Sequence, residues 1–339
     1  MKAVKEHRIL VFGDLQNVAQ SYSDITRTWS ALPQIPVTIT IAFSPTACVL
    51  GTGAFFMWVV LSQCLGVDLE LVLAAMRTVP NLTHFPPGLL PLMTSFLYGQ
   101  SIVVAGGYDS KGIVLASAVC YSLHSRSWRT DVPSMTTPRC GSATVEMDGR
   151  MLVFGGMNAT VFVKSCEAFD PTTNQWTPLP PMSTPREEAC AVTWEGRAFV
   201  FGGFDGLTAL SSAECFDPTT NQWSAIAPMT TVRRSAAAVV VPGRGVLMMG
   251  GITHNVLHSA ELYDPVANRW TTMTWELPTP LYDFAAHYID GVLHIVGGCT
   301  LYGHCIRDCW SMDLNSTVPV WSSLPPMPLA VHPMTSVTV

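Results

Sequence analysis

The chain has 339 residues, a formal charge of −6 and 48% apolar residues, while only 12% of its residues are charged. This composition argues against long charged helices, and the acidic balance without a run of basic residues argues against a nucleic-acid partner. The 25 prolines and 25 glycines favour many short strands joined by tight turns.

The N-terminal segment reads MKAVKEHRILVFGD. Its apolar run, Ile9 to Phe12, is too short for the core of a signal peptide. The ten cysteines are spread along the chain without a CxxC pair, which favours a reducing compartment and buried thiols. We therefore expect a cytoplasmic protein.

The next segment is strongly apolar. Ala47 to Val67 is long enough to span a bilayer, although its glycines, Ser62 and Gln63 dilute its hydropathy. The segment also aligns in phase with a two-strand pattern at residues 142–156, with Thr52 and Gly53 at the turn. We favour a degenerate copy of that pattern over a membrane segment.

A repeat then dominates the chain. Five Gly-Gly pairs follow apolar runs at intervals of 47 to 49 residues, with first glycines Gly106, Gly155, Gly202, Gly250 and Gly297. A tryptophan follows each pair, at Trp128, Trp176, Trp223, Trp270 and Trp321. Extending the period backwards reaches residue 13, where Trp29 follows, and residue 59, where the glycines and tryptophan are lost. The sequence therefore predicts seven units, of which the first two are degenerate.

One unit predicts four antiparallel strands. Residues 142–156 form two β-prone runs around Asp148-Gly149, a dipeptide that favours a two-residue hairpin turn. The third and fourth strands flank FDPTTNQ, in which Asp170 bonds forward to the backbone, Pro171 fixes φ and Asn174 tolerates a left-handed conformation. The eight residues FDPTTNQW occur at 169–176 and again at 216–223.

The two ends of the chain are complementary. Residues 328–339 align with the first strand of a unit, whereas the chain begins in a second strand at residues 8–10. Together they complete one sheet and close a ring. We therefore predict an all-β, seven-bladed β-propeller that forms one domain over 1–339. Its clear repeats cover about 96–325, its degenerate blades about 8–91 and its closing strand about 328–339.

The unit resembles the Kelch repeat in its Gly-Gly pair, a glutamate two residues before an aromatic-Asp-Pro, its tryptophan and PMxxxR. The resemblance covers residues 9–339, is strong over 102–321 and is weak over 37–91. Many proteins that it resembles are substrate receptors of cullin-RING ubiquitin ligases with BTB and BACK domains ahead of the propeller, and we expect neither domain in this chain. Others are actin-binding or scaffold proteins, and a few are enzymes, namely a copper radical oxidase and a sialic acid epimerase.

The resemblance also suggests a partner-binding face. Arginines at equivalent positions of three units would form a basic arc, and the loops after Gly-Gly would add side chains beside it: the candidate residues are Arg139, Arg186, Arg233, Tyr108, Phe204, His254 and Tyr302. In related substrate receptors such arginines contact acidic segments. The alternative is that the arginines close contacts between blades. Loss of binding in Arg186→Ala would support the first role, and loss of thermal stability the second.

No pattern indicates catalysis. Glu167, Glu214 and Glu261 recur singly, which suits a structural hydrogen-bond acceptor rather than a catalytic acid. The segment from Cys299 to Cys309 lacks the paired short spacings of zinc sites, so we predict no metal and no cofactor. We expect a non-catalytic interaction module that binds an acidic protein segment, as a recognition or scaffold subunit of a ubiquitin ligase. An actin-associated scaffold or an epimerase-like or oxidase-like enzyme is the alternative.

Overall fold

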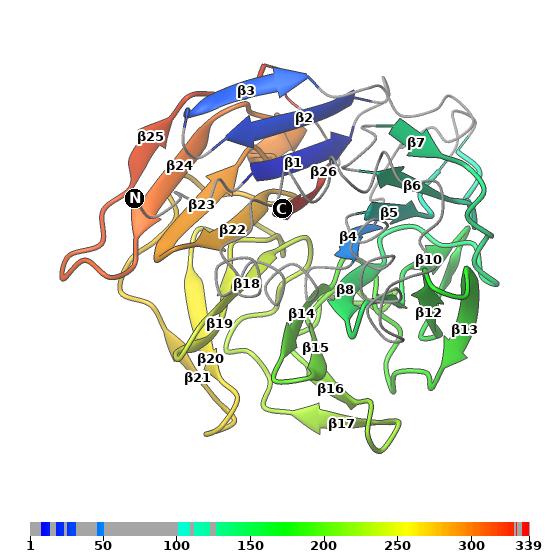
Figure 1. Cartoon of the computed structure of the whole chain (residues 1–339). Coiled ribbons are helices and arrows are strands. Elements are labelled where there is room, and N and C mark those ends of the chain that lie inside the picture. The colour runs from blue at the N-terminus through cyan, green and yellow to red at the C-terminus, as the bar shows by residue number, and fades with distance from the viewer. Residues whose placement is uncertain are drawn as a thin grey trace, which may run out of the picture.

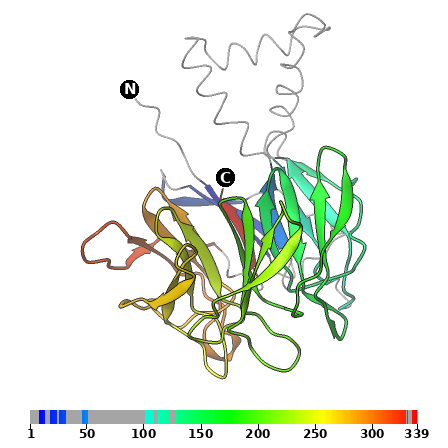
Figure 2. The ribbon, with the colours of Figure 1, turned by 90° about the horizontal axis from the view of Figure 1, so that it is seen from below.

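The computed structural model describes residues 8–13, 18–23, 26–31, 46–50, 101–108, 112–122, 127–328, 330 and 334–338. These residues form six antiparallel four-stranded sheets that stand around one axis, as Figure 1 shows. Figure 2 shows the ring from the side, with loops at its two faces. The fold is an all-β propeller.

In each sheet the four strands are hydrogen-bonded to their neighbours in a fixed order. The first two sheets contain β26 (Met334–Thr338), β1 (Arg8–Gly13), β2 (Val18–Ser23) and β3 (Thr28–Ala31), and then β4 (Thr46–Leu50), β5 (Ser101–Ala105), β6 (Ala118–Ser122) and β7 (Ser127–Arg129). The next two contain β8 (Ala143–Met147), β9 (Arg150–Phe154), β12 (Cys166–Asp170) and β13 (Gln175–Leu179), and then β14 (Cys190–Trp194), β15 (Arg197–Phe201), β16 (Ala213–Asp217) and β17 (Gln222–Ile226).

The last two sheets contain β18 (Ala237–Val241), β19 (Gly245–Met249), β20 (Ala260–Asp264) and β21 (Arg269–Thr272), and then β22 (Ala285–Ile289), β23 (Val292–Val296), β24 (Cys309–Asp313) and β25 (Ser322–Leu324). A small ribbon of β10 (Met157–Asn158) and β11 (Val161–Phe162) and the short 3-10 helix η1 (Leu301–Gly303) lie in loops.

The ends of the chain close the ring. β26 pairs antiparallel with β1, so that Thr338 lies opposite Ile9 and Met334 opposite Gly13. The first strands β4, β8, β14, β18, β22 and β26 each lie next to the first strand of the following sheet, and β26 returns to β4. The predicted closing strand is confirmed.

The predicted count of seven blades is not confirmed, because the described residues form six sheets. Thr46–Leu50 is a first strand, as the alignment predicts, but it pairs with Ser101–Ala105 in the sheet of Trp128. It therefore does not begin a blade of its own. Residues 51–100, which include most of the predicted second blade and of the apolar segment Ala47 to Val67, lie outside the described residues.

The turns follow the local sequence. Asp148 and Gly149 both have positive φ, 53° and 74°, in the hairpin between β8 and β9. In the DPTTNQ turn, the Thr172 amide donates to Asp170 Oδ1 over 2.7 Å, and Asn174 has a φ of 54°. Both turn predictions are confirmed.

The antiparallel order gives the ring two different faces. At one face lie the loops between second and third strands and the connectors that lead from each sheet to the next; we call it the loop face. At the other lie the hairpins that join first to second and third to fourth strands; we call it the hairpin face.

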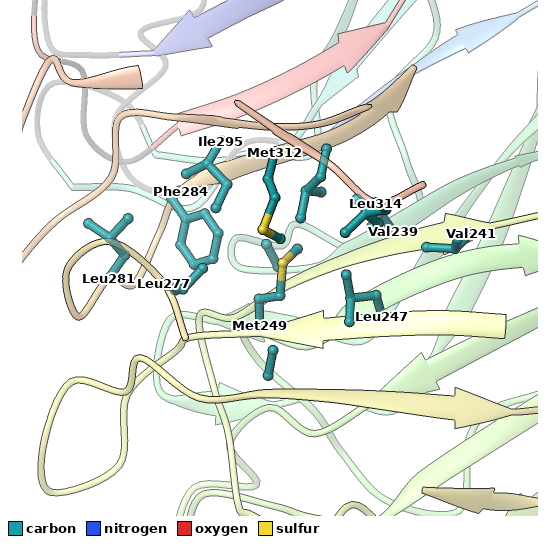
Figure 3. Close-up of a cluster of buried hydrophobic side chains, with 13 residues drawn as sticks. Val239, Val241, Leu247, Met249, Leu277, Leu281, Phe284, Ile295, Met312 and Leu314 are labelled. Carbon is teal, nitrogen blue, oxygen red and sulfur yellow. The ribbon is translucent and has the colours of Figure 1, made fainter. Parts of the chain in front are cut away.

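Apolar side chains fill the space between neighbouring sheets. Figure 3 shows the cluster between the last two sheets, in which Met249, Leu281 and Phe284 are fully or almost fully buried. The repeated tryptophans also join neighbours: the Trp223 indole N–H donates to Pro180 O over 2.9 Å, and Trp270 does the same to Ala227 O. Stability therefore depends on contacts between sheets as much as on the sheets themselves.

The first glycine of the pairs at Gly106, Gly155, Gly202 and Gly250 has a steric reason, which can be tested. A methyl group on Gly202 (φ 62°) would overlap the backbone oxygen of Arg233, whereas one on Gly149 (φ 74°) would meet nothing within 4 Å. We expect Gly149→Ala to cost only the left-handed backbone penalty, about 1–2 kcal/mol. Gly202→Ala should cost about 1–3 kcal/mol more because of overpacking. Urea unfolding of both variants measures the difference, and equal losses would contradict this account.

Candidate functional site

The three repeated arginines lie inside the protein. Arg139, Arg186 and Arg233 sit in successive connectors and are 0%, 1% and 1% exposed. This corrects the expectation that they form an exposed basic arc. The alternative that the sequence left open, contacts between blades, describes their position.

Arg186 shows how each arginine joins two sheets. Its backbone oxygen accepts a hydrogen bond from Gly156 N of the preceding sheet over 2.7 Å. Its guanidinium donates to Gly202 O and Ser212 O of the following sheet, both over 2.8 Å. It also pairs with Glu214 at 3.1 Å. Arg139 and Arg233 make the equivalent bonds, with Glu167 and Glu261 as their partners.

The repeated glutamates are structural acceptors, as predicted. Glu214 accepts hydrogen bonds from the backbone amides of Ser183 and Thr184 as well as from Arg186. Burial raises the pKa of the equivalent Glu167, but the Thr136 amide and the Arg139 guanidinium more than offset it, so that the pKa lies below its usual value. The glutamate is thus ionised and fully bonded inside the fold.

The joint before the last sheet has no ion pair. Leu281, which is fully buried, takes the position of the arginine. Trp310 on β24 takes the position of the glutamate and packs against the same hydrophobic cluster as Leu281. Replacing both members of a buried ion pair by apolar groups avoids an unpaired buried charge. The arginine therefore serves the joint between sheets rather than a partner.

The other predicted site residues lie in the loops after Gly-Gly of four different sheets. Tyr108 and Phe204 are half-buried at the base of their loops, whereas His254 and Tyr302 are exposed at loop tips. Tyr108 interacts with the Cys140 thiol, and burial raises its pKa above the usual value. The prediction that these loops belong to one face is supported by their common place in each sheet.

Exposed apolar side chains gather on this loop face. Of the large hydrophobic residues that are exposed in the described part of the chain, five lie in loops after Gly-Gly, on four different sheets: Ile113, Val161, Leu207, Leu301 and Tyr302. Of these five, the sequence prediction includes only Tyr302, because most of the predicted residues are the first in their loops. A lone exposed leucine needs no explanation, but a set on one face makes that face the candidate for an interaction surface.

Leu207 shows how firmly a tip is held. Asp205 Oδ1 accepts the backbone amides of Leu207 and Thr208, both over 2.8 Å. A Cβ on Gly206 would lie 2.6 Å from the Phe162 ring of the neighbouring loop. Leu207 is nevertheless 87% exposed. The turn therefore holds an apolar side chain in solvent with little freedom of its backbone.

Aromatic and charged side chains connect the bases of the loops. The Phe162 and Phe204 rings meet edge to face, with 5.4 Å between their centroids. The Arg234 guanidinium carbon lies 5.2 Å from the centroid of the Phe204 ring. Arg234 also pairs with Glu188 at 3.4 Å. Burial and the neighbouring Glu188 raise the pKa of Glu187 to about 7, although Arg234 opposes this. The chain of contacts crosses three consecutive sheets.

The described residues offer no metal-binding cluster: no three histidine, cysteine, aspartate or glutamate side chains among them are grouped to hold an ion. The cysteines that the structure describes are free thiols. Within the same residues, no helix has the length and apolarity needed to cross a membrane.

Comparison with known proteins agrees with this architecture. A family model described as the KLHDC2/KLHL20/DRC7 Kelch-repeats domain matches residues 92–281, more than half of the chain. The chain belongs to this Kelch-repeat family. A Kelch propeller is typically a protein-interaction module, and most of the loop face described above lies within the matched range.

The individual relatives match shorter stretches of this chain than the family model does. F-box/kelch-repeat protein At1g26930 of Arabidopsis thaliana is 35% identical over 91 residues, which are 25% of this chain and 21% of that protein. Kelch-like protein 41a of Danio rerio is 26% identical over 157 residues, 44% of this chain and 24% of that protein. The chain thus spans about a quarter of their length or less.

A solved structure, that of YjhT, superimposes with a TM-score of 0.67 over 92% of this chain and 96% of that chain. The sequence identity is 14%, so the likeness supports the fold alone.

The structural role of the arginines can be measured. Arg186→Leu leaves Glu214 ionised, buried and without its cation, so we expect a loss of about 3–5 kcal/mol in the free energy of unfolding. Arg129→Leu is the matched control, because its pair with Asp131 is exposed on both sides and worth less than about 1 kcal/mol. Urea unfolding of both variants tests this, and a similar small loss in each would restore the exposed-arc interpretation.

Glu187 should make stability depend on pH. Its folded pKa of about 7 lies above the usual value of 4.5. The folded state therefore holds the proton of Glu187 more tightly than the unfolded state does. The resulting contribution to the free energy of unfolding is fully present below about pH 4.5 and is lost as pH rises through 7. We expect Glu187→Gln to raise the melting temperature relative to the unmodified protein at pH 8, but not at pH 5. The same change in melting temperature at both pH values would contradict this account.

Proposed function

We propose that the loop face docks another protein, with Leu207 and Tyr302 as its principal anchors. The observation that carries the proposal is the set of apolar loop tips on four sheets around one face, with Leu207 at 87% and Tyr302 at 89% exposure. A few side chains that become desolvated at the centre of an interface supply most of its binding energy, and tyrosine is among the most frequent of them.

The rigidity of the face supports the same function. Asp205 fixes the Leu207 turn, and the contacts from Phe162 through Phe204 to Arg234 hold the bases of neighbouring loops. A surface whose loops are already ordered loses less conformational entropy on binding. The loops therefore suit recognition of a partner without large rearrangement.

The charge of the partner follows less directly. We infer an acidic segment from sequence, but the three arginines behind that inference are buried. Arg234 does lie on the loop face, where Glu188 pairs with it at 3.4 Å. An acidic side chain of a partner would compete with Glu188 for that guanidinium, so apolar contacts should contribute more to affinity than charge.

We further propose that the module serves as a recognition or scaffold subunit, with a ubiquitin-ligase component bound in trans. The F-box/kelch-repeat relatives support this, since their names place an F-box and Kelch repeats in one protein. A ligase component would co-purify with the chain under this proposal. Its absence from purified complexes would remove the ligase role while leaving the docking face untouched.

A paired substitution tests the docking face. Leu207 and Val266 are both 87% exposed, but Leu207 lies on the loop face and Val266 on the hairpin face. We expect Leu207→Asp to reduce capture of the partner at least about tenfold, because it places a charge on a desolvated anchor. Val266→Asp should leave capture unchanged.

Quantitative mass spectrometry of proteins purified with the two variants and the unmodified chain gives the readout. Melting temperatures of both variants should match the unmodified protein, since substitutions at exposed positions usually change stability by less than about 0.5 kcal/mol. Equal recovery of the same partners by both variants would overturn the proposal.

A further inference from the structure

Two thiols meet beneath the loop that carries Tyr302. Cys299 is fully buried just after β23, and Cys305 is half-buried on the returning side of the loop. Their sulfur atoms are 2.8 Å apart and not joined by a disulfide. The thiols of Cys166, Cys190 and Cys309 contact backbone oxygens instead.

The backbone register suits a bond between the two sulfurs. Cys299 and Cys305 face each other as an antiparallel bridge. The Thr300 amide donates to His304 O and the Ile306 amide to Gly298 O, both over 2.9 Å. These bonds flank the cysteines, which therefore form a non-hydrogen-bonded pair, the closer kind, with Cα atoms typically about 4.5 Å apart. Disulfides span Cα distances of about 4.4–6.8 Å, so the bond needs no rearrangement of the chain.

The last sheet also lacks the arginine that holds this loop elsewhere. In the preceding sheet, Arg233 Nη1 donates to Gly250 O and Ser259 O, at the two ends of the loop after Gly-Gly. Arg139 and Arg186 do the same in their sheets. Leu281 at the equivalent position has no donor in its side chain. The thiol pair lies across the one loop of these four whose two ends are not bonded by an arginine from the connector; Arg307, within the loop, donates to Pro328 O instead.

We propose that Cys299 and Cys305 are a redox modification site, which a peroxide converts into a reversible disulfide that fixes the Leu301–Tyr302 tip. Cys305, the more exposed thiol, attacks the peroxide as its thiolate; an S–O bond forms, the O–O bond breaks and hydroxide leaves. The Cys299 sulfur then displaces the sulfenic oxygen of Cys305, which leaves as water. The two thiols lose two electrons and two protons, and one hydrogen peroxide becomes two waters. A dithiol reductant reverses the bond by exchange.

The disulfide would fix a backbone that is otherwise unfavourable. Tyr302 has a φ of 66° and Gly303 one of 73°, in the left-handed region that only glycine adopts freely. Tyr302 is also 89% exposed, so few contacts of its side chain hold it there. The consequence for binding depends on the proposed docking function: a partner that contacts Tyr302 should bind the oxidised protein more tightly, because the tip is ordered beforehand.

The bond can be tested without a partner. The tryptic peptide of residues 270–307 contains Cys299 and Cys305 and no other cysteine. After treatment with hydrogen peroxide, unfolding and alkylation, we expect this peptide to carry no alkyl group and to be two hydrogens lighter. With a dithiol reductant it should take up two alkyl groups. Cys305→Ser should leave Cys299 alkylated, and Cys190→Ser, at another half-buried thiol, should not affect the disulfide.

Limited proteolysis reports on the loop itself. Chymotrypsin cleavage after Tyr302 should be at least several-fold slower in the oxidised protein, and Cys305→Ser should abolish the difference. Two alkyl groups on the peptide after peroxide, or sulfinic and sulfonic acids in place of the disulfide, would overturn the proposal. A disulfide that forms while Leu207→Asp still captures every partner would overturn the docking function and leave the redox site standing.

Discussion

The joint between neighbouring sheets rests on a guanidinium buried in the connector. Arg139, Arg186 and Arg233 each bond by their backbone to the sheet behind and by their side chain to the sheet ahead. A buried cation is tolerated only when its charge and its donors are all matched. At the Arg186 joint the glutamate, two backbone oxygens and a serine supply that match, and Arg233 is bonded in the same way, whereas Arg139 leaves its Nε unpaired. The position of one side chain thus fixes the approach of two sheets.

The last joint shows that the requirement is for a matched set rather than for charge. Leu281 replaces the arginine and Trp310 the glutamate. Pro278 stands where the other connectors have a residue whose amide donates to the glutamate, as Ser183 does to Glu214. Proline has no such amide, so one of the two amides that the glutamate accepts elsewhere is lost together with the acceptor. The arginine, the glutamate and one amide donor are thus all replaced at this joint. This is expected if burying any one of them without its partners would cost free energy of folding.

The sequence predicts what depends on local chemistry and on the repeat. The Asp148-Gly149 hairpin, the DPTTNQ turn and the return of the C-terminal strand to the first segment are all confirmed, because turn residues and phase specify them. The partner of Thr46–Leu50 was predicted wrongly, since strand pairing is not local and the actual partner begins at Ser101. The direction of the arginines was not predictable either, because spacing gives a position on the ring but not the side on which a flexible side chain lies.

The position of the loop face could be predicted from sequence, but the side chains exposed on it could not. The reason is the set of hydrogen bonds that each connector arginine makes. Its Nη1 bonds to both ends of the loop after Gly-Gly, so the base of each such loop is fixed while its tip is unconstrained by the repeat. The tips therefore vary from sheet to sheet, as Val161, Leu207 and His254 do. Periodicity reveals only what is shared, whereas recognition depends on what differs between copies. Where the connector arginine is absent, no connector side chain bonds both ends of the loop, and Cys299 and Cys305 meet at that place. A thiol pair differs from a guanidinium in that it can be bonded or unbonded, so the proposed disulfide would make the order of this loop depend on redox conditions.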